Sequence, residues 1–303
     1  LAMSANRLAK EASSVEAFLL SDGEIQRVLQ AVYAAGAAIL EVYGRADFSV
    51  EHKADDSPLT AADRAAQLVL DAALRATPFP VLSEEGRSIP YSERSQWSAL
   101  WVVDPLDGTK EFIKRNGEFT VNVALVHNGI PLFGIVFAPV PGWVFVGHST
   151  LGAFHADTAL TWNELRARPA VRVKGSETNA ELLSRSPLRV VASRSHNSPE
   201  TEALLAQWEE EFGPVERVSM GSSLKLCWVA LGKAEAYPRL APTMEWDTAA
   251  GQAFAEAAGC SVRVVKRAVD GTFSWEEPLR YNRPDLLNPW FLVCGASYLC
   301  GDV

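Results

Sequence analysis

The chain has 303 residues, which is enough for two hydrophobic cores. Its composition, 48% hydrophobic and 21% charged, is that of a globular protein, and a net charge of −9 at pH 7 argues against polyanionic partners such as nucleic acid polymers. Because no apolar run reaches membrane-spanning length and residues 1–20, an N-terminal extension, lack a signal-peptide core, we expect a cytoplasmic protein. The cysteines have no metal-site or disulfide-framework spacing, and we expect them to be reduced thiols: Cys227, Cys260, Cys294 and Cys300.

Two helices are expected near the N-terminus. Residues 21–43 begin with Ser21 and Glu24 at capping-box spacing, and Gly44 follows as the expected end. A second helix is expected at residues 60–76, where Thr60 and Asp63 have a similar spacing. Asp63 therefore either caps this helix or is a functional acid, and the local sequence leaves both alternatives open.

Acidic residues follow two predicted strands. The strand at residues 80–82 leads to Glu84, and the strand at 101–103 leads to Asp104 and Asp107. Gly108 and Thr109 come next, before a helical turn that begins at residues 110–112. Carboxylates are hard ligands for a divalent cation, and free backbone N–H groups at a helix start suit a phosphate. An ordinary turn with an aspartate cap would explain either aspartate alone, but not this whole group of residues.

The remaining pattern divides into two halves. From residue 119 apolar and polar residues alternate, and Asn128-Gly129 is a strong hairpin signal before further antiparallel strands at 132–140, 143–147 and 152–154. Residues 157–187 look irregular and contain the expected join between an α+β subdomain, 21–180, and an α/β subdomain, 181–303. In the second half, strands expected at 188–192, 215–220, 235–240, 261–266 and 290–294 alternate with helices from residues 198, 222 and 246. Asp247 starts the last helix, so it is either an N-cap or a third functional acid, and the small residues 249–251 allow a backbone or ligand to approach closely.

Four ordered motifs, SPLTAAD (57–63), LSEEG (82–86), DPLDGTKEF (104–112) and EWDTAAG (245–251), carry a family resemblance across nearly the whole chain. The sequence resembles the magnesium-dependent, lithium-sensitive inositol monophosphatase superfamily. The resemblance implies a layered αβαβα sandwich, a possible homodimer, and two or three Mg²⁺ ions in each site. It implies metal ligation by the Glu84, Asp104, Asp107 and Asp247 carboxylates and the Leu106 carbonyl, and it implies that Asp63 and Thr109 activate a water that hydrolyses a phosphomonoester.

In detail the sequence is most similar to the 3'(2'),5'-bisphosphate nucleotidases within this superfamily, through KEF (110–112), NGEFT (116–120), ASRSH (192–196), GSSLK (221–225) and YPR (237–239). The substrate expected from this resemblance is adenosine 3',5'-bisphosphate, cleaved at its 3'-phosphate. The residues expected to contact it are Glu84, Leu106, Asp107, Gly108, Thr109, His196, Ser222, Ser223, Lys225, Arg239 and Asp247. The alternative is an inositol monophosphatase or another phosphatase of small sugar or inositol phosphates. A non-catalytic binding protein is a further alternative, against which the presence of every expected catalytic acid argues.

Overall fold

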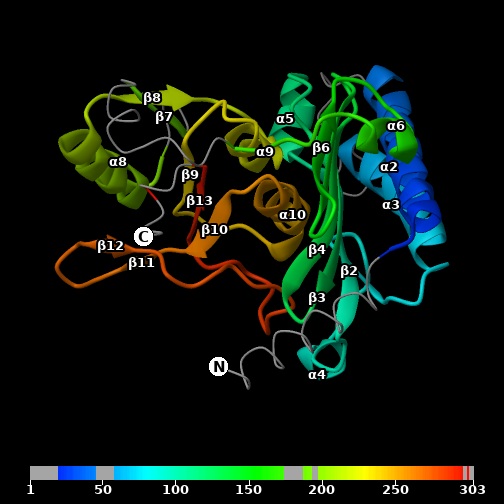
Figure 1. Ribbon diagram of the computed structural model, residues 1–303. Helices are drawn as coiled ribbons and strands as arrows, with labels where there is room; N and C mark the ends of the chain where they lie inside the picture. Colours follow the sequence, from blue (N-terminus) through cyan, green and yellow to red (C-terminus); the bar gives the residue numbers. More distant parts are fainter. Residues whose placement is uncertain (1–19, 46–57, 174–186, 193–196, 296–298, 300–303) are drawn as a thin grey trace, which may run out of the picture.

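The computed structural model describes residues 20–45, 58–173, 187–192, 197–295 and 299. The described elements stack as two sheets and three helical layers, in the order helices, sheet, helices, sheet, helix (Figure 1). Three hydrophobic clusters of buried side chains fill the spaces between successive layers. This arrangement confirms the predicted αβαβα sandwich.

The outer helical layer consists of α2 (Asp22–Arg45) and α3 (Pro58–Leu74), which pack on each other and on the first sheet. The predicted capping box precedes α2: Ser21 N–H donates to Glu24 Oε2 at 2.8 Å, and Glu24 N–H donates to Ser21 Oγ at 3.3 Å. The predicted end of this helix at Gly44 was wrong, because the helical backbone continues to Arg45. The start predicted at Thr60 was also wrong, since α3 begins two residues earlier at Pro58, whose ring favours the first helical turn.

The first sheet has six strands in the order of the chain, and all of its neighbouring strands are antiparallel except β1 and β2. Its strands are β1 (Val81–Ser83), β2 (Ala99–Asp107), β3 (Thr120–His127), β4 (Ile130–Ala138), β5 (Trp143–His148) and β6 (Gly152–Ala156). Asn128 and Gly129 both have positive φ, 48° and 77°, as a two-residue hairpin with a type I′ turn requires. Three short helices accompany the sheet: α4 (Tyr91–Arg94), α5 (Thr109–Lys114) and α6 (Trp162–Arg166). The sequence analysis missed α6, although Thr161 and Glu164 form a capping box in front of it.

The second sheet mixes parallel and antiparallel pairs in the order β10-β13-β9-β7-β8. Its strands are β7 (Leu188–Val191), β8 (Val215–Val218), β9 (Ala236–Arg239), β10 (Ser261–Val264) and β13 (Phe291–Cys294). Its helical elements are α8 (Pro199–Phe212), α9 (Leu224–Ala230), the 3₁₀ turn η1 (Glu245–Asp247) and α10 (Ala249–Ala257). A small hairpin of β11 (Lys266–Arg267) and β12 (Phe273–Ser274), which the sequence analysis did not predict, extends beside this sheet (Figure 1).

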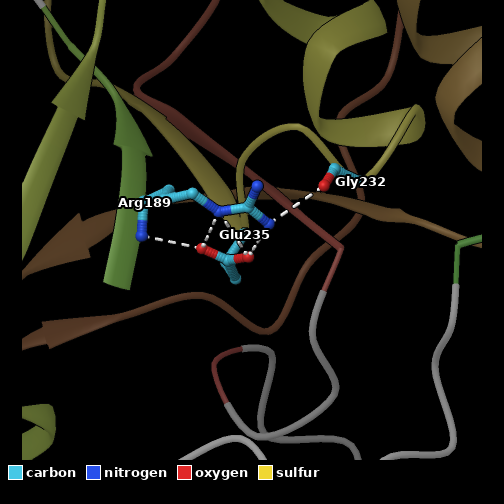
Figure 2. A network of polar contacts seen from close by, with 3 residues as sticks. All are labelled: Arg189, Gly232 and Glu235. Carbon is cyan, nitrogen blue, oxygen red and sulfur yellow. Dashed lines mark hydrogen bonds and ion pairs between the residues drawn. The ribbon is translucent and has the colours of Figure 1, made fainter. Parts of the chain in front are cut away.

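An ion pair ties the connection between α9 and β9 to β7. Figure 2 shows the Arg189 guanidinium directed at the Glu235 carboxylate and the Gly232 carbonyl. Arg189 Nη2 donates to Glu235 Oε1 at 2.5 Å and to the Gly232 carbonyl at 3.0 Å. Two backbone contacts add to this pair, since Arg189 N–H donates to Glu235 Oε2 and Glu235 N–H donates to the Arg189 carbonyl. The charged pair therefore holds the start of β9 beside β7, its neighbour in the second sheet.

The helix α10 packs very closely against the first sheet. A Cβ atom placed on Gly147 would lie 2.4 Å from backbone atoms of Ala253 and Phe254, and one on Gly134 would lie 2.6 Å from the Ala250 carbonyl oxygen. The small residues of the last motif thus allow a backbone to approach, as predicted, and that backbone belongs to β4. This contact holds the start of α10, next to Asp247, against the interior strands of the first sheet.

Three of the four cysteines are buried in the described structure: Cys227, Cys260 and Cys294. Cys300 and the predicted subdomain boundary at residue 180 lie outside the described residues. Among the described residues, no helix combines the length and the apolar character that a membrane span needs.

Candidate active site

The end of β2 presents two aspartates to the same side of the sheet. The strand was predicted to stop before Asp104, and this was wrong. It continues through Pro105 to Asp107. The pairing with β3 shifts between Asp104 and Asp107, and the backbone N–H of Leu106 donates to Asp104 Oδ1 at 3.0 Å inside this irregular segment. Gly108 then turns the chain with φ of 103°, a conformation that favours glycine. The helix α5 begins at Thr109, one residue before the predicted start at Lys110.

Carboxylates from three separate elements meet here. Glu84 follows β1, Asp104 lies near the end of β2, and Asp247 ends the turn η1; one oxygen of each lies within 4.8 Å of the others. The alternative interpretation of Asp247 as the cap of α10 was wrong, because Thr248 occupies that position. The Asp247 carboxylate instead accepts the Met244 N–H at 2.8 Å, which stabilises the 3₁₀ turn that presents it.

The cluster is electrostatically unfavourable without a cation. Burial, followed by repulsion from Asp107 and Glu84, raises the pKa of Asp104 well above its usual value, and burial with the Asp107 charge raises the pKa of Asp247 to about 7. Glu84 is partly exposed, but desolvation of its carboxyl group and the charges of Glu85 and Asp107 also raise its pKa. In addition, Asp104 Oδ2 is buried and has no hydrogen-bond partner among the described residues. Closely spaced carboxylates with a buried, unpaired oxygen fit a hard divalent cation with oxygen ligands.

The two residues expected to activate water lie on neighbouring helices. Asp63 is in the first turns of α3 and Thr109 begins α5, and these helices contact each other. Burial raises the pKa of Asp63 to about 8, with further contributions from the charges of Glu85 and Glu84. The Asp63 carboxyl group is therefore within electrostatic reach of the cluster, which favours the functional interpretation over a cap alone. The Thr60 side chain lies outside the described residues.

A cleft of about 620 Å³ extends from the cluster towards the second sheet. Most of the residues expected to contact substrate line it: Glu84, Leu106, Asp107, Gly108, Thr109, Lys225, Arg239 and Asp247. Lys225 Nζ donates to the Ser222 carbonyl at 3.2 Å, while Arg239 donates to the Pro242 carbonyl and its buried Nε has no hydrogen-bond partner in the described structure. His196 lies outside the described residues.

Two lysines of the cleft wall were missed by the sequence analysis. Lys110 and Lys114 line the cleft from α5, four positions apart on the helix. The sequence could have indicated them, because Lys110 and Lys114 are four positions apart in the helix that follows the DPLDGT segment, and residues at i and i+4 share one face of a helix. Together with Lys225 and Arg239 they supply positive charge close to the acidic cluster.

Ser222 and Ser223 differ from the sequence expectation. Both are nearly buried, neither lines the cleft, and both hydroxyl groups point to the carboxylate of Asp107. Their Oγ atoms lie 2.5 and 2.9 Å from Asp107 Oδ2. Both hydroxyl groups therefore donate hydrogen bonds to Asp107, whereas the sequence analysis expects them to contact the substrate.

Comparison with known proteins places this site in context. Residues 23–289 match the model of the inositol monophosphatase family. The chain is 43% identical over 275 residues to proteins named 3'(2'),5'-bisphosphate nucleotidase CysQ from Escherichia coli K12 and Shigella flexneri, covering 89% of this chain and 98% of each relative. The crystal structure of CysQ from Bacteroides thetaiotaomicron, described as a bacterial member of the inositol monophosphatase family, is 47% identical with a TM-score of 0.75 and covers 88% of this chain and 95% of that one.

Proposed function

Because this chain belongs to the inositol monophosphatase family, we propose that it is a 3'(2'),5'-bisphosphate nucleotidase that removes the 3'-phosphate of adenosine 3',5'-bisphosphate. The observation that carries the proposal is the convergence of Glu84, Asp104 and Asp247 in a cleft that three lysines and an arginine also line. The nucleotidase names of the relatives at 43% identity support the choice of substrate.

The ligands of the divalent cations are proposed to be Glu84, Asp104, Asp107, Asp247 and the Leu106 carbonyl, and the cations to be Mg²⁺, two or three in each site. When bound, such cations polarise a phosphate and stabilise the charge on the attacking and leaving oxygens. Asp104 is the buried member of this set and would hold an ion from the protein side, whereas Glu84 is exposed to the cleft.

The protein's own groups position the water and the phosphate. The Asp63 carboxylate accepts a proton from the attacking water, and the Thr109 hydroxyl group orients that water by a hydrogen bond. The first N–H groups of α5, at Gly108 and Thr109, have no partner within the helix and donate to the phosphate oxygens. Asp63 is suited to this role because its pKa lies far above that of an ordinary aspartate and falls when positive charge is bound beside it.

The second phosphate of the substrate requires cationic side chains in the same cleft. We assign it to Lys225 and Arg239, with Lys110 and Lys114 on α5 as further cations. A charge-assisted hydrogen bond contributes about 1.5–3 kcal/mol, which corresponds to about one to two decades in kcat/KM if it is formed in the transition state. A substrate with a single phosphate, such as inositol 1-phosphate, leaves these cations without an anion, which disfavours the alternative monophosphatase function.

The test compares kcat/KM for adenosine 3',5'-bisphosphate, inositol 1-phosphate and inositol 1,4-bisphosphate in the presence of Mg²⁺. We expect the adenosine bisphosphate to be preferred, and Lys225→Ala to lower its kcat/KM by about one decade or more while that of inositol 1-phosphate changes little. Preference for inositol 1-phosphate, or equal losses on both substrates, would refute the nucleotidase assignment. Inhibition by LiCl in the same assay and a dimer by light scattering are further expectations from the family resemblance.

A further inference from the structure

We propose that a ring of hydrogen bonds through Thr120, Asn122, Ser222 and Ser223 is a positioning device for Asp107. The ring engages one carboxylate oxygen, Oδ2, and leaves the other, Oδ1, to face a divalent cation. The inference rests on the proposed function, because it assigns these four residues to the cation site of that reaction. It explains why polar side chains stand where a hydrophobic core would otherwise continue.

The ring is a closed circuit of five short contacts. Asp107 Oδ2 lies 2.5 Å from Ser222 Oγ and 2.9 Å from Ser223 Oγ. Behind them, Ser222 Oγ lies 2.6 Å from Thr120 Oγ1, and Ser223 Oγ lies 2.7 Å from Asn122 Nδ2. The circuit closes between Thr120 Oγ1 and Asn122 Oδ1, 3.0 Å apart. Every member therefore contacts two others.

The available protons determine which group donates and which accepts in the contacts of the ring. The Asn122 amide nitrogen can only donate, so Ser223 Oγ accepts its proton and must direct its own hydroxyl proton elsewhere. Ser223 Oγ has two acceptors, Asp107 Oδ2 and the Asp247 carbonyl at 2.5 Å, and so joins two proposed metal ligands. Ser222 directs its proton to Asp107, since a charged carboxylate is a stronger acceptor than the neutral Thr120 hydroxyl. Thr120 has a single hydroxyl proton, so it donates either to Ser222 Oγ or to Asn122 Oδ1, and the other of these two contacts carries no proton. Both serines thus direct their hydroxyl groups to Asp107 Oδ2.

The fold brings the ring together from three elements. Across the pair of β2 and β3, Thr120 stands opposite Asp107 and Asn122 stands opposite Asp104, and residues two apart on a strand share one face. Thr120 and Asn122 are both fully buried on this face. The serines come from the segment before α9 in the second half of the chain, so the ring also joins the two halves at the site.

Two costs indicate that the ring has a purpose beyond filling space. Burying four polar side chains is unfavourable unless each is hydrogen-bonded. In addition, Ser222 has φ of 52°, a left-handed conformation that a serine rarely adopts and that persists only where surrounding contacts hold it. A bond from Ser222 Oγ to the Asp107 carbonyl, at 3.1 Å, adds to those contacts. The strain is located at the residue that donates to Asp107.

Two substitutions of Thr120 separate hydrogen bonding from packing. Thr120→Val keeps the shape and removes the hydroxyl group, whereas Thr120→Ser keeps the hydroxyl group and removes a methyl. Mn²⁺ affinity of the substrate-free protein, measured by isothermal titration calorimetry, is the readout. If the ring positions Asp107, Thr120→Val lowers Mn²⁺ affinity about tenfold and Thr120→Ser lowers it by less than about threefold. A lower Mn²⁺ affinity in Thr120→Ser than in Thr120→Val would show that packing, and not the hydroxyl group, is responsible, and it would overturn the proposal.

Ser223→Ala tests the ring next to the carboxylate, where the expected loss of Mn²⁺ affinity is about 10- to 100-fold. Thr77→Val is the matched control, since the Thr77 hydroxyl group bonds the Leu74 carbonyl and the Trp101 indole far from the cleft. It should lower the melting temperature without changing Mn²⁺ affinity. Unchanged affinity in Ser223→Ala would also overturn the proposal. Because binding is measured without substrate, absence of bisphosphate hydrolysis by a wild-type protein that binds Mn²⁺ would refute only the proposed function.

Discussion

Glu256 on α10 provides a quantitative test of the electrostatics, because it lies apart from the proposed metal ligands. Its pKa is raised from 4.5 to about 7 by burial, against the opposing effects of its hydrogen bond from Gln252 and the charges of Arg280 and Arg263. Gln252 Nε2 donates to Glu256 Oε1 at 2.9 Å. Glu256→Gln keeps an acceptor for that bond and the shape of the side chain, and removes the carboxylate that is costly to ionise.

The sign of the effect follows from proton linkage. The folded protein holds the Glu256 proton up to a higher pH than the unfolded chain, so the stability of the wild type falls relative to the variant as pH rises from 4.5 to about 7. A tenfold change in proton affinity corresponds to about 1.4 kcal/mol, so the variant should be more stable by about 1 kcal/mol at pH 5.5 and by about 3 kcal/mol at pH 8.5. For a chain of this length, about 3 kcal/mol raises the melting temperature by about 5 °C.

The assay is thermal unfolding of both proteins in EDTA at pH 5.5 and pH 8.5. EDTA removes divalent cations, so that metal binding does not contribute to either melting temperature. The wild type measured at each pH serves as the reference for the titration of all other groups. A difference that does not grow between pH 5.5 and pH 8.5, or a variant less stable than the wild type at pH 8.5, would refute the argument.

Three further predictions concern the site and the packing around it. Asp104→Asn should abolish both Mg²⁺-dependent phosphatase activity and Mn²⁺ binding, because it removes a charge at the centre of the cluster; retained binding would contradict the ligand assignment. Asp63→Asn should lower kcat by about 10²–10⁴-fold while Mn²⁺ affinity stays within about threefold, as a proton acceptor that is not a ligand requires, and a matched loss of affinity would argue otherwise. Gly147→Ala should destabilise the fold by about 1–3 kcal/mol in urea unfolding, because the added Cβ would meet the α10 backbone at 2.4 Å. Gly44→Ala is the control: its added Cβ would have no atom within 4 Å, and it should stabilise α2 by about 0.5–1 kcal/mol. Equal effects of the two glycine substitutions would show that close packing of α10 is not the cause.

Several features of the fold were determined by short stretches of sequence. The turn at Asn128-Gly129 needs two residues that tolerate positive φ, and the capping box at Ser21 needs only a serine and a glutamate three positions apart. The alternation along β3 likewise divides its residues between two faces, because side-chain direction in a strand has a period of two. The acids after β1 and at the end of β2 were predictable for the same local reason, since each follows an apolar run of strand residues within a few positions.

The functions of individual polar residues depended on the tertiary structure. Ser222 lies 115 positions from Asp107 along the chain, and no local pattern specifies that its hydroxyl group bonds that carboxylate instead of a substrate. In the sequence, the position of Asp247 is also that of a helix cap. In the fold, α10 packs against Gly134 and Gly147, and Asp247 lies close to Asp104 of β2. Backbone conformation is governed by neighbours in the chain, whereas burial, charge and hydrogen bonding at a site are governed by neighbours in space. The sequence by itself therefore determined that acids stand where two strands end, and only the folded chain decided that Asp247 joins them and which groups hold them in position.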